Sequence, residues 1–381
     1  MSELNASNLR KEHGNEGPDL VGLTELTSPY YMVPPSGTTE QRPQNPQPGT
    51  LRFNTDIGSL EYFKGDTIGW ESIDRTTPNL GGGTGSNAGT GARGIIGGGF
   101  TSPGNTQVIE YITISTCGDG QTFGDLTRGD RHAYSGVSSK TRGCFGGGFP
   151  QSTQATIDYV TIATLGNATD FGDLSVGRIA ATGVSNQTRG CYLGGYEYGA
   201  NAARDTIDYI TIATTGNAQD FGNLLSAWEP GSQTSCNSST RGIAFKTNAS
   251  NVIQYITIAT TGNSVDFGDV ATGTGAGAGL SNATRGIIAG GGTPGNANTI
   301  EYITIATLGN ATDFGDLNQG NASGAGTSSP TRGVITGMKT PSIFKTIDYI
   351  QIATTGDAKD FGDLTEAKSV FGACSNAHGG L

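Results

Sequence analysis

Short runs of β-branched and aromatic residues alternate along the chain with clusters of Gly, Asn, Ser and Thr. The runs at 156–164 and 188–196 have the length and composition of β-strands, and the polar clusters between such runs are typical of turns. No segment has convincing helical periodicity. In the run 156–164, Ile157 and Tyr159 point to one face and Val160 to the other, so both faces are partly apolar. The pattern predicts an all-β protein with sheets covered on both sides.

From about residue 92 onward, one unit of strands and turns repeats six times. Each unit opens with an Arg-Gly pair and contains a tyrosine, and a phenylalanine follows that tyrosine after twelve residues. Successive tyrosines are separated by 48, 50, 46, 47 and 47 residues. Four strands can be counted in each unit, which predicts a six-bladed β-propeller over residues 92–381. The repeated tyrosines are Tyr111, Tyr159, Tyr209, Tyr255, Tyr302 and Tyr349. The arginines that open the units are Arg93, Arg142, Arg189, Arg241, Arg285 and Arg332.

The last segment of the chain predicts how this array closes. The first unit begins at the strand led by Arg93 and lacks an inner strand, whereas the segment from Val370 to Ser375 matches an inner strand that no further strands follow. We expect this segment to complete the first blade, with His378 where the other units carry arginine. Inner strands are crowded near the axis, and this accounts for the small residues around Gly275 and Gly324 in a chain with 63 glycines.

The first quarter of the chain has a different pattern. Residues 1–49 are polar and proline-rich, which predicts an extended arm. Residues 50–75 alternate as a small β-hairpin unit, and residues 76–91 form a Gly-rich linker. The apolar face of the hairpin unit is too small to bury itself, so we expect it to form a homo-oligomer, such as a trimer, or to dock into a larger assembly. This face comprises Leu51, Phe53, Leu60, Tyr62 and Trp70.

Composition and charge exclude several classes of protein. With 22 Lys and Arg against 33 Asp and Glu, the net charge of −11 argues against binding to nucleic acid or to anionic lipid. No apolar run approaches the roughly 18 residues that a membrane-spanning helix needs, and the opening residues lack the apolar core of a signal peptide. The five cysteines form no CxxC pair, so neither a zinc site nor a disulfide framework is predicted.

Candidate catalytic chemistry is sparse. The histidines His13, His132 and His378 are scattered, and we interpret them as ordinary surface or turn residues rather than members of a catalytic triad. Six similar units provide six similar scaffold positions rather than one unique constellation, so we predict no enzymatic activity, no cofactor and no metal. Two readings of the acidic motifs stay open: calcium ligation, or turns whose side chains bond nearby amides, which we favour. The clearest motifs are Asn167, Asp170 and Asp173, and Asn310, Asp313 and Asp316.

The six arginines also allow two interpretations. They could ring one face and bind an anionic glycan, or they could pair with aspartates of neighbouring blades. We favour the structural interpretation for these arginines and for the repeated tyrosines. A candidate ligand site lies instead in the variable segment that follows Gly195, where Tyr196 and Tyr198 are suited to stacking on sugar faces. The alternative for these two rings is packing on a neighbouring blade.

Three resemblances to known families suggest a fold and a function. Double or triple glycines, then Tyr, then an aromatic residue twelve positions later resemble kelch blades, although Phe replaces the kelch Trp and the strands led by Arg241 and Arg332 lack a double glycine. The segment 35–73, PSGTTEQRPQNPQPGTLRFNTDIGSLEYFKGDTIGWESI, resembles parts of tail-fibre and other virion proteins of tailed bacteriophages. The YITIATTGNATDFGDL-type repeat is similar to that of structural proteins of marine tailed phages that infect cyanobacteria.

These resemblances imply a virion surface protein of the tail-fibre or appendage type. Its N-terminal region would contact other virion proteins, and its propeller would face a glycan or protein of the host surface for attachment. Two other functions remain open: a decoration or cement protein of the capsid or tail that recognises no receptor, and a glycan-cleaving propeller enzyme, which the lack of a unique acid pair disfavours.

Overall fold

The computed structural model describes residues 34–56, 59–67, 69–72, 92–102, 104–129, 132, 135–149, 155–228, 234–246, 250–271, 276–292, 297–320, 322–337, 342–369 and 371–381. The chain divides into two compact units, Met1–Thr76 and Thr77–Leu381. Most of the predicted arm, residues 1–33, and the predicted linker lie outside the described residues. No helix among the described residues is long and apolar enough to cross a membrane.

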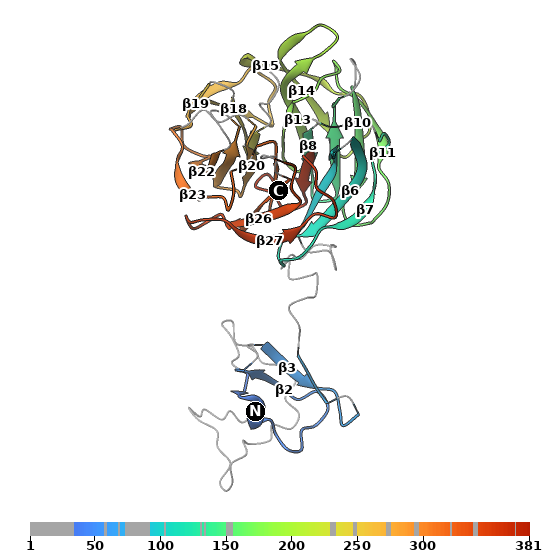
Figure 1. The fold of residues 1–381 in the computed structure, drawn as a ribbon, viewed down its shortest axis with the longest axis vertical. Helices are drawn as coiled ribbons and strands as arrows, with labels where there is room; N and C mark the ends of the chain where they lie inside the picture. Colours follow the sequence, from blue (N-terminus) through green and yellow to red (C-terminus); the bar gives the residue numbers. More distant parts are fainter. Residues whose placement is uncertain are drawn as a thin grey trace, which may run out of the picture. The chain divides into compact units, whose positions relative to one another are not determined.

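The second unit consists of six four-stranded antiparallel sheets arranged around a common axis (Figure 1), which we call blades 1–6. The strands of each blade are named below from the innermost to the outermost. Blade 1 contains β28 (Gly372–Ser375), β5 (Arg93–Phe100), β6 (Asn105–Thr113) and β7 (Gln121–Asp125). Blade 2 contains β8 (Ser135–Ser138), β9 (Arg142–Gly146), β10 (Thr156–Thr161) and β11 (Thr169–Asp173), and blade 3 contains β12 (Thr182–Ser185), β13 (Arg189–Glu197), β14 (Ala202–Thr211) and β15 (Gln219–Trp228).

The remaining three blades have the same strand order. Blade 4 contains β16 (Thr234–Asn237), β17 (Arg241–Phe245), β18 (Val252–Thr257) and β19 (Val265–Asp269). Blade 5 contains β20 (Ala278–Ser281), β21 (Arg285–Gly291), β22 (Ala297–Thr304) and β23 (Thr312–Asp316), and blade 6 contains β24 (Ala325–Ser328), β25 (Arg332–Thr336), β26 (Thr346–Gln351) and β27 (Lys359–Asp363). The prediction of an all-β fold with six repeated four-stranded units is confirmed.

The C-terminal strand closes the array, as the sequence predicts. Strand β28 pairs with β5 in antiparallel register, with Gly372 opposite Gly97 and Ser375 opposite Gly94. Each inner strand lies beside the inner strand of the next blade, and β28 lies beside both β24 and β8. The last residues of the chain lie near the middle of the sheets in Figure 1. This closed arrangement is consistent with a six-bladed β-propeller.

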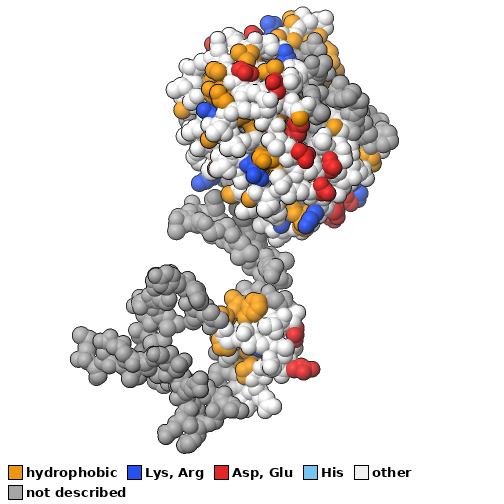
Figure 2. Space-filling model, turned by 90° about the vertical axis from the view of Figure 1, so that its left-hand side faces the viewer, with side chains coloured by type: hydrophobic (Ala, Val, Ile, Leu, Met, Phe, Trp, Pro, Cys, Tyr) orange, Lys and Arg blue, Asp and Glu red, His pale blue; other side chains and the backbone are white. Residues whose placement is uncertain are grey.

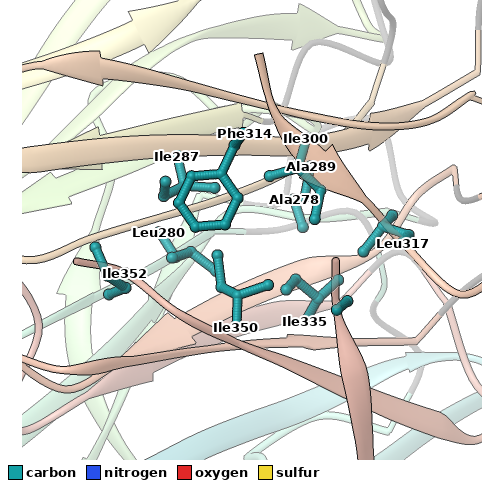
Figure 3. Packing of buried hydrophobic residues seen from close by; sticks show 11 residues of the cluster. Ala278, Leu280, Ile287, Ala289, Ile300, Phe314, Leu317, Ile335, Ile350 and Ile352 are labelled. Carbon is teal, nitrogen blue, oxygen red and sulfur yellow. The ribbon is translucent and has the colours of Figure 1, made fainter. Parts of the chain in front are cut away.

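Apolar side chains fill the space between adjacent blades. Between blades 5 and 6, Phe314 and Ile287 pack with Ile350 and Ile352, and all four side chains are buried (Figure 3). The two faces of each blade therefore both carry apolar residues, which explains the two-sided pattern of the sequence. Complete burial of one such side chain stabilises the fold by about 1.5–3 kcal/mol. Each of the six interfaces between adjacent blades buries a cluster of such side chains.

Crowding at the axis explains the glycines of the inner strands. A Cβ atom added to Gly279 would lie 2.1 Å from the carbonyl oxygen of Ser235 in the preceding blade. A Cβ on Gly136 would lie 2.4 Å from the carbonyl oxygen of Ala373. Because both obstacles are backbone atoms, they cannot move aside without displacing a strand. The expectation that inner strands need small residues is confirmed for these positions, whereas Gly275 lies outside the described residues.

The first unit contains one small sheet with the order β1 (Ser36–Gly37), β2 (Leu51–Asn54), β3 (Ser59–Phe63) and β4 (Trp70–Ser72). Strands β2, β3 and β4 are antiparallel, whereas β1 pairs in parallel with β2. A short 3-10 helix, η1 (Thr39–Gln41), follows β1. Both β1 and η1 lie in the stretch whose composition predicts an extended arm.

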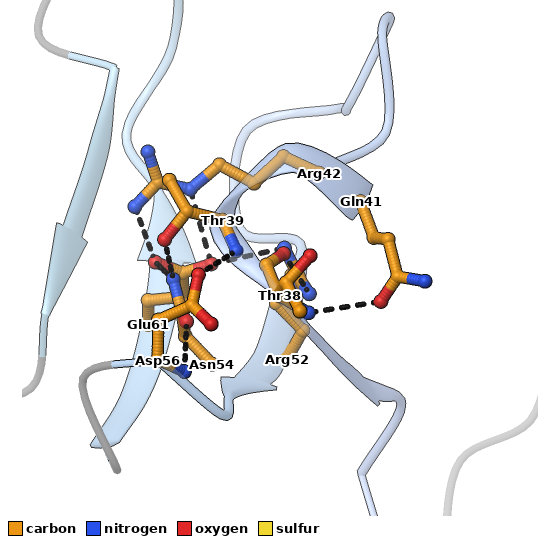
Figure 4. A network of polar contacts seen from close by, with 8 residues as sticks. All are labelled: Thr38, Thr39, Gln41, Arg42, Arg52, Asn54, Asp56 and Glu61. Atoms are coloured by element: carbon orange, nitrogen blue, oxygen red, sulfur yellow. Dashed lines mark hydrogen bonds and ion pairs between the residues drawn. The ribbon is translucent and has the colours of Figure 1, made fainter.

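The covered face of this small sheet combines a polar network with two rings, Phe63 and Trp70, whose centroids are 5.5 Å apart. Glu61 is fully buried and accepts hydrogen bonds from Arg42 Nη2 at 2.6 Å and from Asn54 Nδ2 at 3.1 Å (Figure 4). The buried Arg52 adds an ion pair with Glu61 at 3.2 Å. The hydrogen bond from Arg42 lowers the pKa of Glu61, so the carboxylate remains charged.

The opposite face carries Leu51, Phe53, Leu60 and Tyr62 and is only partly covered. Trp70, which the sequence pattern predicts on this face, lies opposite Phe63 in the sheet and therefore on the covered face. Leu51 is 38% exposed, and Phe53 and Tyr62 are half-buried. Figure 2 shows hydrophobic side chains of this unit at its surface, whereas the second unit shows them as separate small patches among acidic and basic ones. This small sheet therefore buries charges and leaves apolar side chains accessible, the reverse of an ordinary isolated domain.

Candidate functional site

Five ring side chains from blades 1 to 3 form a continuous row, which we call the aromatic strip. Ring centroids are 5.8 Å apart between Phe100 and His132, 5.1 Å between His132 and Phe149, and 5.1 Å between Phe149 and Tyr198. Tyr196 contacts Tyr198 edge-on, with 5.3 Å between the centroids. These separations lie in the range where aromatic pairs attract each other. The strip therefore joins three blades into one apolar surface.

Main-chain hydrogen bonds hold the strip in place. Where β5 ends, Phe100 exchanges two hydrogen bonds with Ser369, at 2.8 and 3.0 Å. After β9, Phe149 exchanges two with His132, at 2.8 and 3.0 Å. In the same way, Tyr196 in β13 pairs with Ile179. In each case the segment that leads to an inner strand pairs with an extension of a second strand, so Phe100, His132, Phe149 and Tyr196 are fixed by paired backbone. Tyr198 lies in the turn that follows β13.

Accessibility and polarity suit the strip to a neutral ligand. Tyr198 is 48% exposed, while the other four rings are half-buried. The hydroxyl of Tyr196 donates to Asn201 Oδ1 at 2.6 Å, which fixes the orientation of its ring. Next to the tyrosines, Arg204 pairs with Glu197, so the two charges compensate each other. Burial lowers the pKa of His132, so this imidazole is neutral at pH 7.

Of the two interpretations of these tyrosines, packing on a neighbouring blade is confirmed for Tyr198, and stacking on a ligand stays a prediction. Tyr198 packs on Phe149 of the neighbouring blade and still exposes about half of its surface. An exposed ring with partly buried neighbours can stack on the apolar face of a sugar or another planar group. The structure adds Phe100, His132 and Phe149, which sequence reasoning missed. A signal was present, because an aromatic residue directly follows the glycine run in three of the repeats, at Phe100, Phe149 and Tyr196.

The repeated arginines lie at the opposite ends of the second strands and contact neighbouring blades. Each guanidinium lies 4.3–4.7 Å from the ring centroid of the repeated tyrosine of its own blade. Each Nη1 donates to a main-chain carbonyl of the next blade at 2.7–2.9 Å, for example from Arg93 to Ile162 and from Arg332 to Ile114. The expected pairing with aspartates is therefore wrong. The contact joins all six blades in a closed circuit.

The Asn and Asp motifs also connect blades. Asn167 Oδ1 accepts a hydrogen bond at 3.0 Å from the amide of Asp125 in the preceding blade, and Asn310 does the same for Asp269. The outer strand approaches this turn so closely that a Cβ on Gly172, which has φ +143°, would lie 2.5 Å from the carbonyl oxygen of Gly216. The Asn side chains thus accept hydrogen bonds from main-chain amides of the preceding blade rather than from amides of their own turn. No group of three or more His, Cys, Asp and Glu side chains in the described parts of the chain is arranged to hold a metal.

A hydrogen-bonded ring surrounds the axis. The last residue of an inner strand donates through its side chain to the equivalent carbonyl of a neighbouring blade at five junctions, with distances of 2.6–2.8 Å. The donor–acceptor pairs are Ser375–Ser328, Ser328–Ser281, Ser281–Asn237, Asn237–Ser185 and Ser138–Ser375. These residues line a mainly polar cavity of about 90 Å³.

His378 completes this ring at the sixth junction, between blades 2 and 3. Its Nε2 lies 3.1 Å from Ser138 O and 3.3 Å from Ser185 Oγ. Its Nδ1 accepts hydrogen bonds from Asn237 Nδ2 and from the amide of Gly380, both at 3.1 Å. The neutral imidazole with the proton on Nε2 satisfies these contacts. His378 lies in the turn that follows β28, as predicted, but its side chain points to the axis rather than to the surface.

Burial lowers the pKa of His378 to about 4, which keeps the imidazole neutral at pH 7. His132 also differs from the prediction, since it lies in the aromatic strip, and His13 lies outside the described residues. No protein-family model and no curated protein matches this sequence.

Proposed function

We propose that this chain is a non-enzymatic virion surface protein of a tailed phage that binds a glycan of the host surface through the aromatic strip. The observation that carries the proposal is the strip itself. The arginine, asparagine and inner-ring contacts recur around the axis, whereas the strip is confined to blades 1–3 and leaves a tyrosine half-exposed. In this proposal the sheets form a closed, kelch-like propeller that serves as a rigid support for recognition.

The energetics of such a strip favour weak individual contacts. Two or three stacked sugar rings at about 0.5–1.5 kcal/mol each provide only a few kcal/mol, which corresponds to a weak monovalent affinity. Several copies that bind one surface together would gain affinity by avidity without any new contact. This supports a second part of the proposal: the N-terminal unit forms a homo-oligomer and contacts other virion proteins.

The test of glycan binding uses the full chain on an array of bacterial surface glycans. The proposal expects binding to at least one glycan and a loss of that binding in the double variant Tyr198→Ala/Phe149→Ala. Leu308→Ala is a matched control, because Leu308 is 58% exposed and lies in a turn of blade 5. Binding that survives in the double variant contradicts the assignment of the site to the strip.

The N-terminal part of the proposal predicts self-association through the apolar side of the small sheet. Leu51 is 38% exposed on that side. We expect the full chain to be oligomeric by light scattering and Leu51→Glu to shift it toward the monomer, because a charge at a contact loses apolar burial and is desolvated without a partner. Leu308→Glu, which places the same charge on an exposed leucine of the second unit, should leave the mass unchanged. A monomeric wild-type chain rejects this part.

A further inference from the structure

A buried polar side chain precedes the repeated tyrosine in every blade. Each of these side chains is at most 6% exposed and lies at the boundary with the preceding blade. For example, Asp158 accepts a hydrogen bond from Thr127 Oγ1 at 2.6 Å, and Asp208 accepts one from Ser175 Oγ at 2.7 Å. Five of the six side chains are carboxylic acids. The set is Glu110, Asp158, Asp208, Gln254, Glu301 and Asp348.

At two boundaries the chain supplies a buried cation for this carboxylate. Arg178 Nη2 lies 3.1 Å from Asp208 Oδ2, and Lys368 Nζ lies 2.6 Å from Glu110 Oε2. All four side chains are fully buried. Arg178 and Lys368 each come five residues after the last residue of an outer strand. A basic residue at this position of the repeat therefore places its positive charge at the blade boundary.

At the boundary between blades 5 and 6, the described residues supply the carboxylate but no such cation. Asp348 is 1% exposed, its Oδ1 accepts a hydrogen bond from Asn318 Nδ2 at 2.8 Å, and its Oδ2 has no hydrogen-bond partner among the described residues. Five residues after the end of β23, the sequence carries the uncharged Asn321 in place of Arg or Lys. A carboxylate buried without a cation is costly, which is why buried charges are normally paired.

A cavity of about 250 Å³ adjoins Asp348. Its lining consists of Asn318 and Gln319 from blade 5 and of Thr346, Asp348 and Asp360 from blade 6. The lining thus combines two carboxyl groups with amide and hydroxyl groups, all of which can accept hydrogen bonds from a cationic donor. Burial raises the pKa of Asp348, and the nearby Asp360 contributes in the same direction. A cation in this cavity would relieve both effects.

We propose that this cavity binds a primary ammonium or guanidinium group supplied from outside the chain, with Asp348 and Asp360 as its anionic partners. The organic cation follows from the chain's own precedent, because Arg178 and Lys368 fill this role at two other boundaries. A metal ion is a weaker candidate, since no group of three or more His, Cys, Asp and Glu side chains among the described residues is arranged to hold one. The cation comes from a free amine or from a lysine side chain of a protein partner.

The experiment measures the melting temperature of the full chain with two probes, n-butylammonium chloride and the peptide acetyl-Gly-Lys-Gly-amide, against sodium chloride at equal ionic strength. The site predicts a saturable rise of about 2 °C or more that sodium chloride does not produce. A response to both probes assigns the site to free amines as well as lysine, and a response to the peptide alone assigns it to a protein partner. No response to either probe overturns the proposal.

Two variants separate this site from unspecific stabilisation. Asp348→Asn should abolish the response. The control is Asp313→Asn, which removes an exposed carboxylate from the outer strand of blade 5, at the position that Asp360 occupies in blade 6; this variant should keep the response. Asn321 lies outside the described residues, but Asn321→Lys introduces a lysine at the sequence position that Lys368 occupies in blade 6, five residues after an outer strand. This variant should raise the melting temperature by itself and remove the response to both probes. If Asp348→Asn does not fold, this last variant still decides, since an undiminished response in Asn321→Lys overturns the proposal.

Discussion

The two ends of the blades follow different rules. At the end where the second strands begin, all six arginines make the same contact with a tyrosine of their own blade and a carbonyl of the next one. At the other end, only blades 1–3 carry rings that join into the aromatic strip. The repeated end offers six equal positions, and each arginine there already contacts a tyrosine ring and a main-chain carbonyl. The unrepeated end offers one unique surface with an exposed ring.

This difference shows how structure and recognition are divided within a repeat protein. A contact that closes a ring must recur at every boundary, because one missing boundary opens the ring. A recognition surface needs only one place and gains from being unlike the rest. Changes at the repeated positions should therefore alter stability, and changes in the strip should alter binding.

Removing residues 371–381 is expected to have the largest effect. The deletion takes away β28, leaves β5 without its inner neighbour, and removes the buried side chains of Phe371 and Cys374 together with His378. Because β28 joins the two ends of the array, we expect a loss of about 5 kcal/mol or more, comparable to the whole stability of many domains. Calorimetry should show loss of the cooperative transition. A truncated chain that melts like the full chain contradicts the closure.

Acid should weaken the axial ring through His378. The folded pKa of about 4 lies below the ordinary value of 6.5, so the unfolded chain binds a proton first as the pH falls. The contribution of His378 to stability is complete above pH 6.5 and is lost as the pH falls toward 4, by up to about 3 kcal/mol. Denaturant unfolding of the wild type and of His378→Gln at several pH values isolates this effect. Equal pH dependence of the two proteins would reject it.

Replacing one arginine of the repeated end should have a moderate effect. Arg285→Ala removes a cation–π contact with Tyr302, whose centroid lies 4.4 Å away, and a 2.9 Å hydrogen bond to Ile352 O. We expect a loss of about 1–3 kcal/mol, measured by denaturant unfolding. Tyr198→Ala, in the strip, should cost less, because its ring is half-exposed. The comparison between the two ends fails if the tyrosine variant is the less stable of the two.

The repeat made the architecture predictable, because equal spacing of Arg, Tyr and Phe specifies equal strands, and an unpaired strand at the end specifies closure. The partners of the arginines were not predictable in this way. Every residue offers a main-chain carbonyl, so sequence spacing cannot show that Ile162 O rather than an aspartate meets Arg93. Likewise, alternation in β2 distinguishes two faces of the small sheet but not which face is covered. The covering residues, such as Arg42, come from a segment whose composition predicts an extended arm.

The aromatic strip was predictable only in part. Tyr196 and Tyr198 stand out within one repeat, and Phe100 and Phe149 share the position after the glycines. His132 has no such mark, since the residues at the equivalent bridges of the other two blades are Ile179 and Ser369, which carry no ring. Its position follows from the main-chain bridge with Phe149, which only the folded chain reveals. Spatial continuity across three blades is therefore a property of the fold rather than of any single repeat.

The central claim is tested most directly by the affinity of the full chain for the glycan that binds best on the array, measured by calorimetry together with the melting temperature. The account predicts at least a tenfold weaker affinity for Tyr198→Ala/Phe149→Ala than for the wild type, as expected from the loss of about 1.4 kcal/mol or more of stacking. The melting temperature should change by no more than a few degrees, and Leu308→Ala should bind as the wild type does. A double variant that binds the glycan with unchanged affinity, or a wild-type chain that binds no glycan, contradicts the account.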